Sequence, residues 1–497
     1  MTNEVMVAGV KASNDWLAAF TEVVKRTDDA VWGVPLICMI LATGILLTCV
    51  LRFRHLLNLP HALRSMFHTE AGTEGDVSVF GALCTALSAT IGTGNIVGVA
   101  TAIGEGGPGA LFWMEVAALF GMATKYSEGL LAVKYRETAP DGHKLGGPFY
   151  YIEKGLKGRF GIQNWKWLAV LFAVFGMGAG LLGIGTITQV NGITSASQRF
   201  FDPNFNVLDP ATGVHVFGTN CSIAAIVAGA IVTIATALVV IGGLKRIARV
   251  SMVVVPFMAI SYVLICGVIL VANCAKIPAA IETIVRAAFN PSAVMGGAVG
   301  SIFIAMQKGV ARGIFSNEAG LGSEPIAAAA ARTNEPARQG LVCMTGTFID
   351  TIVICSMTGL TIVISGAWDP SLGLNGVDVT IEAFRRGLSF LGPHSGGLAS
   401  FFLMASLTFF AFTTILGWDY YSEKCLEYLV GSHRQRVIKG YRFLYVLFVA
   451  VGPYLTVKVV WGIADTMNGL MAFPNLVALL LLSPVVYKVS KDYFSRN

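Results

Sequence analysis

The sequence predicts an all-α protein that crosses a membrane many times. Of its 497 residues, 55% are hydrophobic and only 13% are charged, and the mean hydropathy is +0.68. A soluble domain carries about 25% charged residues. Some eleven apolar stretches follow one another, each long enough to cross about 30 Å of hydrocarbon at roughly 1.5 Å per residue. The chain is therefore expected to be a polytopic membrane protein with about eleven transmembrane helices.

The expected organisation begins with an extracytoplasmic amphipathic segment, residues 1–30, and an extra transmembrane helix, 31–51. Two groups of five spans, 77–273 and 293–488, and a tail, 489–497, complete the chain. The ten spans of these groups are expected at residues 77–102, 110–133, 165–190, 218–241, 251–273, 293–314, 340–366, 396–427, 440–463 and 466–488.

The distribution of positive charge indicates the orientation. With the N-terminus outside and the C-terminus cytoplasmic, most of the 35 lysines and arginines fall in inside segments. These segments include residues 134–166, residues 424–442 and, at the expected inner end of span 293–314, Lys308 and Arg312. The expected location is the cell (inner) membrane, with the bilayer as partner. The net charge of +6 is too small and scattered for nucleic-acid binding.

The second span is interrupted near its middle by the stretch Ser88 to Gly98. Gly94 and Asn95 are poor helix formers, each costing about 0.5–1 kcal/mol relative to Ala. The spacing of Gly92, Gly94 and Gly98 does not fit the dinucleotide-binding fingerprint. Two interpretations stay open: small residues that let two helices approach closely, or a broken helix whose unpaired backbone groups face a ligand.

A second irregular span, 293–314, lies five spans later and runs in the opposite direction. Gly296, Gly297, Gly300, Gly309 and Gly313 punctuate it, and Gln307 makes its expected inner half polar together with Lys308 and Arg312. Two glycine-broken spans, five apart and antiparallel, are what an inverted repeat of five helices predicts.

Polar residues inside the spans are the candidates for binding. Free N–H groups of Thr93, Gly94 and Asn95 suit a carboxylate, whereas the carbonyls from Ser88 to Ile91 would face a cation. Thr414 and Trp418 share a helix face because they are four residues apart.

Two further polar groups have open interpretations. Gln189 ends a glycine-rich span and would hold an ammonium or carboxylate, or bond to a neighbouring helix. Asp350 lies near the middle of its span, where a carboxyl group could bind the coupling ion, relay a proton or pair with a neighbouring helix.

Several ungapped blocks resemble the alanine or glycine:cation symporter family. They include Gly92-Thr-Gly-Asn-Ile-Val-Gly-Val-Ala100, Gly106-Gly-Pro-Gly-Ala110, Gly146-Gly-Pro-Phe-Tyr-Tyr151 and Gly309-Val-Ala-Arg-Gly-Ile-Phe-Ser-Asn-Glu-Ala-Gly-Leu-Gly322, in the order of the family. The resemblance implies a LeuT-like fold and sodium-coupled, less often proton-coupled, uptake of small neutral amino acids. Two residues depart from the family pattern. An apolar or aromatic residue is expected in place of Glu115, and a small residue is expected in place of Glu324.

The resemblance also implies the site. Sodium would be the co-transported ligand, without an organic cofactor, and Phe410, Thr413 and Thr414 have the spacing of one carbonyl and two hydroxyl ligands. The candidate sodium ligands are Ser88, Ile91, Phe410, Thr413 and Thr414. The candidate substrate-binding residues are Thr93, Gly94, Asn95, Gln189, Gln307, Gly309, Thr414 and Trp418. A monomer is expected.

Three other classes compete with this prediction. A proton-coupled symporter, or one for larger substrates such as glutamine or serine, stays open. A channel would need a continuous polar pore or filter motifs, and an intramembrane enzyme would need paired His or Asp residues at helical spacing. The sequence carries neither pattern, and it lacks a phosphate-binding Gly-x-x-x-x-Gly-Lys loop.

Overall fold

The computed structural model describes residues 19–68, 72–161, 164–206, 213–216, 219–290, 302–454 and 457–496. These residues are mostly helical. The strands β1 (Glu137–Thr138) and β2 (Lys144–Leu145) form one antiparallel hairpin, and β3 (Val214–Val216) and β4 (Thr219–Cys221) form another.

The helices follow one another from residue 19 to the C-terminal end of the chain. A helix at 19–31 comes first. The first half then contains α2 (Val34–Val50), α3 (Arg54–Leu57), α4 (Leu59–Ser65), α5 (Val79–Thr90), η1 (Gly94–Gly98), α6 (Val99–Gly106), α7 (Gly109–Lys134), α8 (Pro148–Tyr150), η2 (Tyr151–Gly155), α9 (Leu156–Phe160), α10 (Lys166–Leu182), α11 (Ile187–Phe201), α12 (Ile223–Val240), α13 (Leu244–Ala272), η4 (Cys274–Lys276) and α14 (Ile277–Phe289). The second half contains α16 (Ile302–Asn317), α17 (Glu324–Ala328), α18 (Pro336–Thr347), η5 (Phe348–Cys355), α19 (Ser356–Ser365), η6 (Pro370–Leu372), α20 (Val377–Gly387), η7 (Ser389–His394), α21 (Ser395–Val430), α22 (Gln435–Val451), η8 (Gly452–Tyr454) and α23 (Val457–Phe494).

Within the described residues, eight helices are long and apolar enough to cross a membrane, or nine if one bent pair counts as a single span. Helix α7, which carries Glu115, Lys125 and Glu128, is not among them. The expected number of eleven spans stays a prediction.

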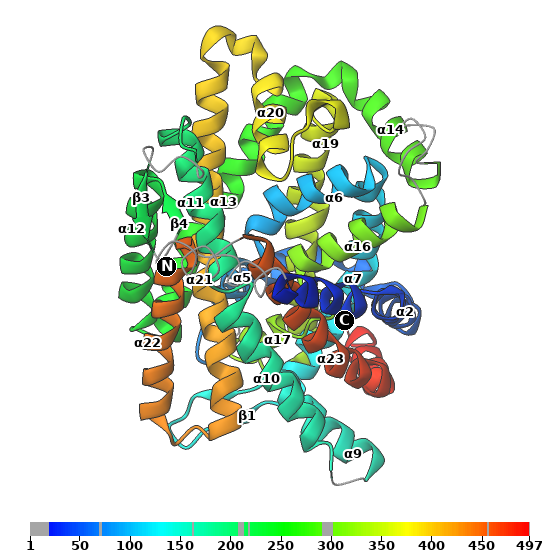
Figure 1. Cartoon of the computed structure of the whole chain (residues 1–497). Coiled ribbons are helices and arrows are strands. Elements are labelled where there is room, and N and C mark those ends of the chain that lie inside the picture. Colours follow the sequence, from blue (N-terminus) through cyan, green and yellow to red (C-terminus); the bar gives the residue numbers. More distant parts are fainter. Residues whose placement is uncertain are drawn as a thin grey trace.

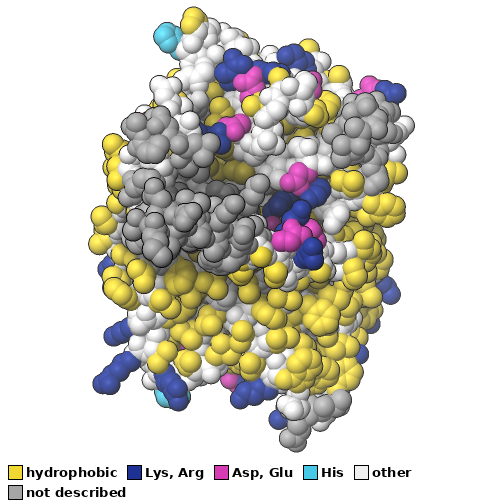
Figure 2. All heavy atoms as spheres, in the orientation of Figure 1, with side chains coloured by type: hydrophobic (Ala, Val, Ile, Leu, Met, Phe, Trp, Pro, Cys, Tyr) yellow, Lys and Arg dark blue, Asp and Glu magenta, His cyan; other side chains and the backbone are white. Residues whose placement is uncertain are grey.

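The outward faces of the helices are apolar, as a lipid environment requires. On α12, Ile223, Ile231 and Leu238 are each more than 60% exposed, and Val253 and Leu264 of α13 are exposed to a similar extent. Figure 2 shows hydrophobic side chains over much of the lower half of one face. In Figure 1, α14 and α20 lie at one end of the upright helices, whereas α9 and β1 lie at the other. The chain folds as a multi-pass membrane protein.

The break in the second span lies where the sequence predicts it. Ser78 caps the start of α5 by accepting a hydrogen bond from Gly81 N, 3.0 Å away. The helix ends at Thr90, and Ile91 is extended with φ −75° and ψ 97°. The chain becomes helical again at η1, and the two halves of the span meet at 51°.

The second broken span differs from its prediction. Helix α16 continues to Asn317, and the chain unwinds from Glu318 to Ser323, so the break follows residues 293–314 instead of lying among their glycines. Residues 293–301 of that span lie outside the described residues. A Cβ added at Gly309 would lie 2.1 Å from the carbonyl oxygen of Ala110 in α7. The glycines in the described part of this stretch therefore serve close helix packing.

This longer span also corrects the placement of Lys308 and Arg312. Gly309 packs on Ala110 near the start of α7, and Lys308 Nζ lies 2.6 Å from Glu105 Oε2 at the end of α6. Both basic residues therefore lie toward the α6–α7 corner, the end of the span that was expected outside.

The structure also corrects two expected span boundaries. The span 165–190 is longer, since α10 and α11 together form a single candidate span, Lys166–Phe201, and Gln189 lies in the first turn of α11. Helix α23 is continuous through residues 463–466, where a break between two spans was expected, and extends into the expected tail as far as Phe494. At this point the carboxylate of Asp465 pairs with Arg312 at 3.2 Å.

Candidate functional site

The residues between α5 and η1 direct backbone N–H groups to neutral side chains. Gly92 N donates to Asn95 Oδ1 at 2.9 Å, and Thr93 N donates to Gln189 Oε1 at 3.3 Å. Thr93, Asn95 and Gln189 are all buried. Thr93 Oγ1 is buried without a hydrogen-bond partner among the described residues. These groups offer N–H donors and a free hydroxyl to a small anionic group.

Asn95 connects this break to a buried carboxylate. Its Nδ2 donates to Asp350 Oδ1 at 2.7 Å, and the other carboxylate oxygen, Oδ2, accepts from Ser316 Oγ at 2.9 Å and from Thr351 Oγ1 at 2.8 Å. Asp350 is fully buried within the wide helical turns of η5. Three neutral donors from three segments therefore satisfy one carboxylate. Glu115 of α7, for which the sequence offered no role, lies close enough to Asp350 to interact with it electrostatically.

Gly94 lies against the end of α16. A Cβ at this position would come within 3.1 Å of Ser316 Cα and 3.3 Å of Ser316 Cβ. The two broken helices therefore meet at Gly94 and Ser316, with Asp350 beside both.

Oxygen atoms of α21 and of the chain at the end of α5 converge on the α5 side of the first break. Thr414 Oγ1 donates to Ile91 O at 3.2 Å and to Phe410 O at 3.0 Å. Thr413 Oγ1 lies 3.0 Å from the same Phe410 carbonyl. A hard cation prefers such carbonyl and hydroxyl ligands. The hydroxyl of Ser88 bonds to Thr85 O within its own helix at 2.7 Å.

Three of the predicted binding residues have other partners. The indole Nε1 of Trp418 donates to Glu318 Oε1 at 2.8 Å, which places this buried side chain against the second break. Gln307 Nε2 donates to Trp32 O at 3.4 Å, and Gly309 packs on α7. Thr93, Gly94, Asn95, Gln189 and Thr414 come together, whereas Gln307 and Gly309 lie farther along α16 from the second break.

Comparison with known proteins identifies the family of this chain. A sequence profile described as the sodium:alanine symporter family matches residues 17–497. A transporter of Haemophilus influenzae described as uncharacterized is 51% identical over 95% of this chain and 96% of its own length. The sodium/alanine symporter AgcS of Methanococcus maripaludis is 46% identical over 95% of this chain and 97% of its own length.

The chain belongs to the sodium:alanine symporter family. It is a transporter, not an enzyme. The crystal structure of MhsT in complex with L-phenylalanine superposes with a TM-score of 0.53 at 13% identity, covering 84% of this chain and 99% of MhsT. This likeness shows the LeuT-like fold for this member of the family.

A cavity of about 440 Å³ leads toward the first break of the transporter from the α6 end. Its lining includes Val97 and Gly98 of η1 together with Arg312 and Asp465. The helix of residues 19–31 lies across it, because Val24 and Asp28 also line this cavity. Gly462 of α23 provides room for this helix, since a Cβ there would lie 2.6 Å from Val24 Cγ1. The predicted amphipathic helix therefore packs on protein.

Charged and polar residues surround the second break, between α16 and α17. Lys125 Nζ lies 2.7 Å from Glu324 Oε2, and both side chains are buried. Asn475 Nδ2 donates to Glu128 Oε1 at 2.6 Å and to Gly320 O at 2.9 Å. The sequence analysis noted Glu324 only as a departure from the family pattern, because its partner Lys125 lies on α7, distant in the chain.

Proposed function

We propose that this chain is a sodium-coupled symporter that brings a small neutral amino acid, alanine or glycine, into the cell by alternating access. The proposal rests mainly on one observation: a buried unwound segment presents N–H donors on one side and two carbonyls with two threonine hydroxyls on the other. The sodium:alanine symporter AgcS, at 46% identity, supports the same choice of ion and substrate.

The substrate carboxylate would bind at Thr93, Gly94 and Asn95. The N–H groups of the break, at the start of a helix with its positive dipole end, favour an anion. The hydroxyl of Thr93 adds a donor, and the amide of Gln189 can accept from the substrate ammonium group. Space beside Gly92 is small, because a Cβ there would lie 2.5 Å from Thr414 Oγ1. This crowding favours a substrate with a short side chain.

Sodium would bind between α5 and α21, with ligands from Ser88 and Ile91 carbonyls, Phe410 O, Thr413 Oγ1 and Thr414 Oγ1. In the structure the two threonine hydroxyls bond to the carbonyls of Phe410 and Ile91. A bound cation would be coordinated by these hydroxyl and carbonyl oxygens in place of the hydrogen bonds. A cation between helices of the two halves stabilises one arrangement over the other only by its differential affinity. Sodium would therefore raise amino-acid affinity, and the amino acid would raise sodium affinity by the same factor.

The test is uptake of radiolabelled alanine, glycine, serine and glutamine into proteoliposomes, with sodium and proton gradients imposed separately. Saturable uptake of alanine or glycine that follows the sodium gradient is expected. Uptake driven by the proton gradient alone would overturn sodium coupling and favour Asp350 as the coupling group. Preference for glutamine would overturn the small pocket, and non-saturable flux would favour a channel. A right-side-out vesicle assay with proteases tests the outside N-terminus and cytoplasmic C-terminus.

A further inference from the structure

The helix of residues 19–31 lies across the cavity of about 440 Å³ that leads to the first break. In Figure 1 it is the dark blue helix that precedes α2. Its partly buried residues recur every three or four positions and therefore share one face, whereas its other residues are exposed. The partly buried residues are Thr21, Val24, Asp28 and Val31. This helix is thus attached to the transporter along one narrow stripe.

Two glycines of α23 receive this stripe. A Cβ added at Gly462 would lie 2.6 Å from Val24 Cγ1, and a Cβ added at Gly469 would clash with Val31 Cγ1. The two glycines are about two turns apart and therefore lie on the same face of α23. Small residues at such positions let two helices approach closely. Val24 and Val31 therefore pack directly on the backbone of α23.

The helix of residues 19–31 joins α2 through a short turn with an anchored side chain. The indole Nε1 of the buried Trp32 donates to Asp465 O at 2.7 Å, and Trp32 O accepts from Gln307 Nε2 at 3.4 Å. The next residue, Gly33, is extended, with φ −67° and ψ 173°, before α2 begins. The helix can therefore change its angle at this turn, while Trp32 stays bound to α16 and α23 and α2 keeps its place.

Another wall of the cavity belongs to the first broken helix. Val97 and Gly98 of η1 and Thr101 of α6 line it, and Thr21, Val24 and Asp28 line it from helix 19–31. Helix η1 begins at Gly94, within the segment to which the proposed function assigns the substrate carboxylate. A substrate that enters through this cavity therefore passes between η1 and helix 19–31.

We propose that helix 19–31 is a lid on the substrate pathway. It lies on α23 when the α6 end of the pathway is closed, and it leaves Gly462 and Gly469 when that end opens. The identity of the substrate rests on the proposed function, but the movement of the lid does not.

The contacts of the lid suit a reversible closure. Methyl groups of valines against a glycine backbone separate without exposing an unpaired charge. Asp28 is the charged member of the stripe, and it lies close enough to Arg312 and Asp465 to interact electrostatically with both. Arg312 attracts its carboxylate and Asp465 repels it, so these two interactions oppose each other. When Asp28 moves away, Arg312 keeps its pairing with Asp465 at 3.2 Å.

The first test displaces the lid and needs no substrate. Gly462→Val places methyl groups where Val24 lies, so it should lift the helix from α23. The measurement is the rate at which a water-soluble maleimide labels Thr101→Cys in the purified full chain in detergent, followed at that residue by mass spectrometry. Adding Gly462→Val should raise this rate roughly tenfold, or about 1.4 kcal/mol in the equilibrium between open and closed lid. If Gly462→Val does not fold, Val24→Asp replaces it.

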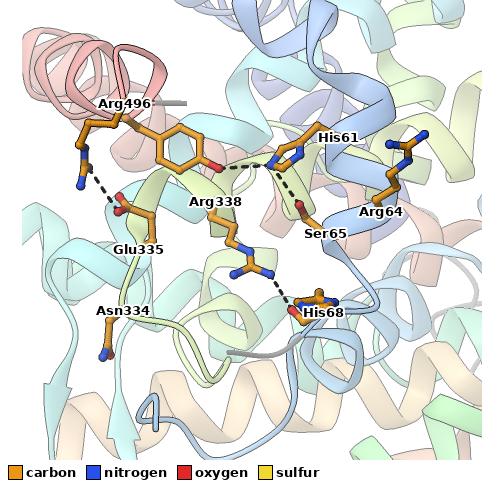
Figure 3. Close-up of a pocket in the computed structure, with 9 residues that line it drawn as sticks. His61, Arg64, Ser65, His68, Asn334, Glu335, Arg338 and Arg496 are labelled. Carbon is orange, nitrogen blue, oxygen red and sulfur yellow. Dashed lines mark hydrogen bonds and ion pairs between the residues drawn. The ribbon is translucent and has the colours of Figure 1, made fainter. Parts of the chain in front are cut away.

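Two matched controls accompany this labelling. Gly440→Val changes a glycine of α22 where an added Cβ would meet nothing within 4 Å, so it should leave the rate at Thr101→Cys unchanged. Asn334→Cys is the control reporter, because Asn334 lines the cavity of Figure 3, to which the far end of α23 contributes Tyr493 and Arg496. Its labelling should not respond to Gly462→Val.

The second test fastens the lid. A Cβ added at Gly462 would lie 3.9 Å from Val24 Cβ, a separation that suits a disulfide. The double variant Val24→Cys with Gly462→Cys should therefore close a disulfide on oxidation, which intact-mass measurement verifies. Sodium-driven alanine uptake into proteoliposomes should then fall roughly tenfold or more and return on reduction. Each single cysteine variant should be insensitive to the oxidant.

Unchanged labelling of Thr101→Cys in both lid variants would overturn the proposal, and so would full uptake by a chain whose disulfide is closed. An equal rise at Asn334→Cys or with Gly440→Val would mean general loosening and would also overturn it. A disulfide that does not form would contradict the contact between Val24 and Gly462. If the unmodified chain takes up neither alanine nor glycine, the proposed function fails, while the labelling still decides whether helix 19–31 is a lid.

Discussion

The two broken helices of this transporter are held open by different chemistry. The first break, Ile91–Thr93, is short, and its backbone bonds to the neutral groups of Asn95, Gln189 and Thr414. The second break, Glu318–Ser323, is longer and contains three residues with positive φ: Glu318, Gly320 and Gly322. Around it lie Lys125, Glu324 and Glu128.

This difference indicates separate roles. A neutral hydrogen bond contributes about 0.5–1.5 kcal/mol, so a carboxylate or a cation can replace it at little cost. Breaking a buried ion pair by removing one partner costs about 3–5 kcal/mol. The first break is therefore suited to exchange its partners for ligands, whereas the second is suited to hold its conformation.

The largest expected effect is on the second break. Lys125→Met leaves the buried carboxylate of Glu324 without its partner, so the stability of the protein should fall by about 3–5 kcal/mol. Thermal unfolding in detergent, followed by loss of monodisperse protein, measures this change. The double variant Lys125→Met with Glu324→Gln should recover part of the loss. If Lys125→Met unfolds at the temperature of the unmodified protein, the second break is not held by this pair.

Trp418 lies between the two breaks and sharpens the comparison. Trp418→Ala removes a large side chain and should therefore admit leucine-sized substrates. In an apolar pocket, each methylene that the pocket accepts or rejects changes the binding free energy by about 1–3 kcal/mol. Trp418→Phe keeps most of the bulk but loses the bond to Glu318. Competition of labelled alanine uptake by leucine measures both. Broadened specificity in Trp418→Phe as well as in Trp418→Ala would mean that the bond to Glu318, and not size, controls the pocket.

The first break should respond through its cation. Thr413→Ala removes one oxygen ligand, so half-maximal sodium should rise roughly tenfold, about 1.4 kcal/mol, with a much smaller change in half-maximal alanine at saturating sodium. Sodium titrations of uptake measure the shift. The matched control is Thr408→Ala, because Thr408 lies on the same helix more than one turn before Thr413. If Thr413→Ala keeps its sodium dependence while Asp350→Asn loses it, the coupling ion lies at the carboxylate.

The smallest effect concerns the β1–β2 hairpin. Arg136, directly before β1, donates to the Ala329 and Ala331 carbonyls that follow α17. His143 Nε2 lies 2.8 Å from Glu427 Oε1, and this hydrogen bond raises the pKa of His143 above its usual 6.5. Asp141 also favours the charged form, and Lys424 opposes it.

The charged form is therefore favoured in the folded protein. Its contribution is complete below about pH 6.5 and is lost as the pH rises through the raised pKa. His143→Gln should remove this pH dependence, a difference of less than about 1 kcal/mol, in thermal unfolding measured from pH 6 to pH 9. Equal pH dependence in both proteins would show that the hairpin is held by Arg136 and its carbonyl partners instead.

The sequence alone determined the features that depend on local composition. The apolar spans and the break near Gly94 and Asn95 follow from hydropathy and helix propensity. The choice of Thr413 and Thr414 as hydroxyl ligands came from the resemblance to the family. The placement of Thr93, Asn95, Gln189 and Thr414 around one break agrees with the expected binding residues, although their roles stay predictions.

Only the tertiary structure decided the features that depend on partners distant in the chain. Glu318 adopts a left-handed conformation beside Trp418, 100 residues away. Gly309 was expected to bind substrate, but it packs against Ala110. Helix α23 passes through Asp465, whose carboxylate pairs with Arg312 of α16. Helix propensity and hydropathy are sums over neighbouring residues, so they carry no information on the side chains that folding brings to a break, a glycine or a buried charge.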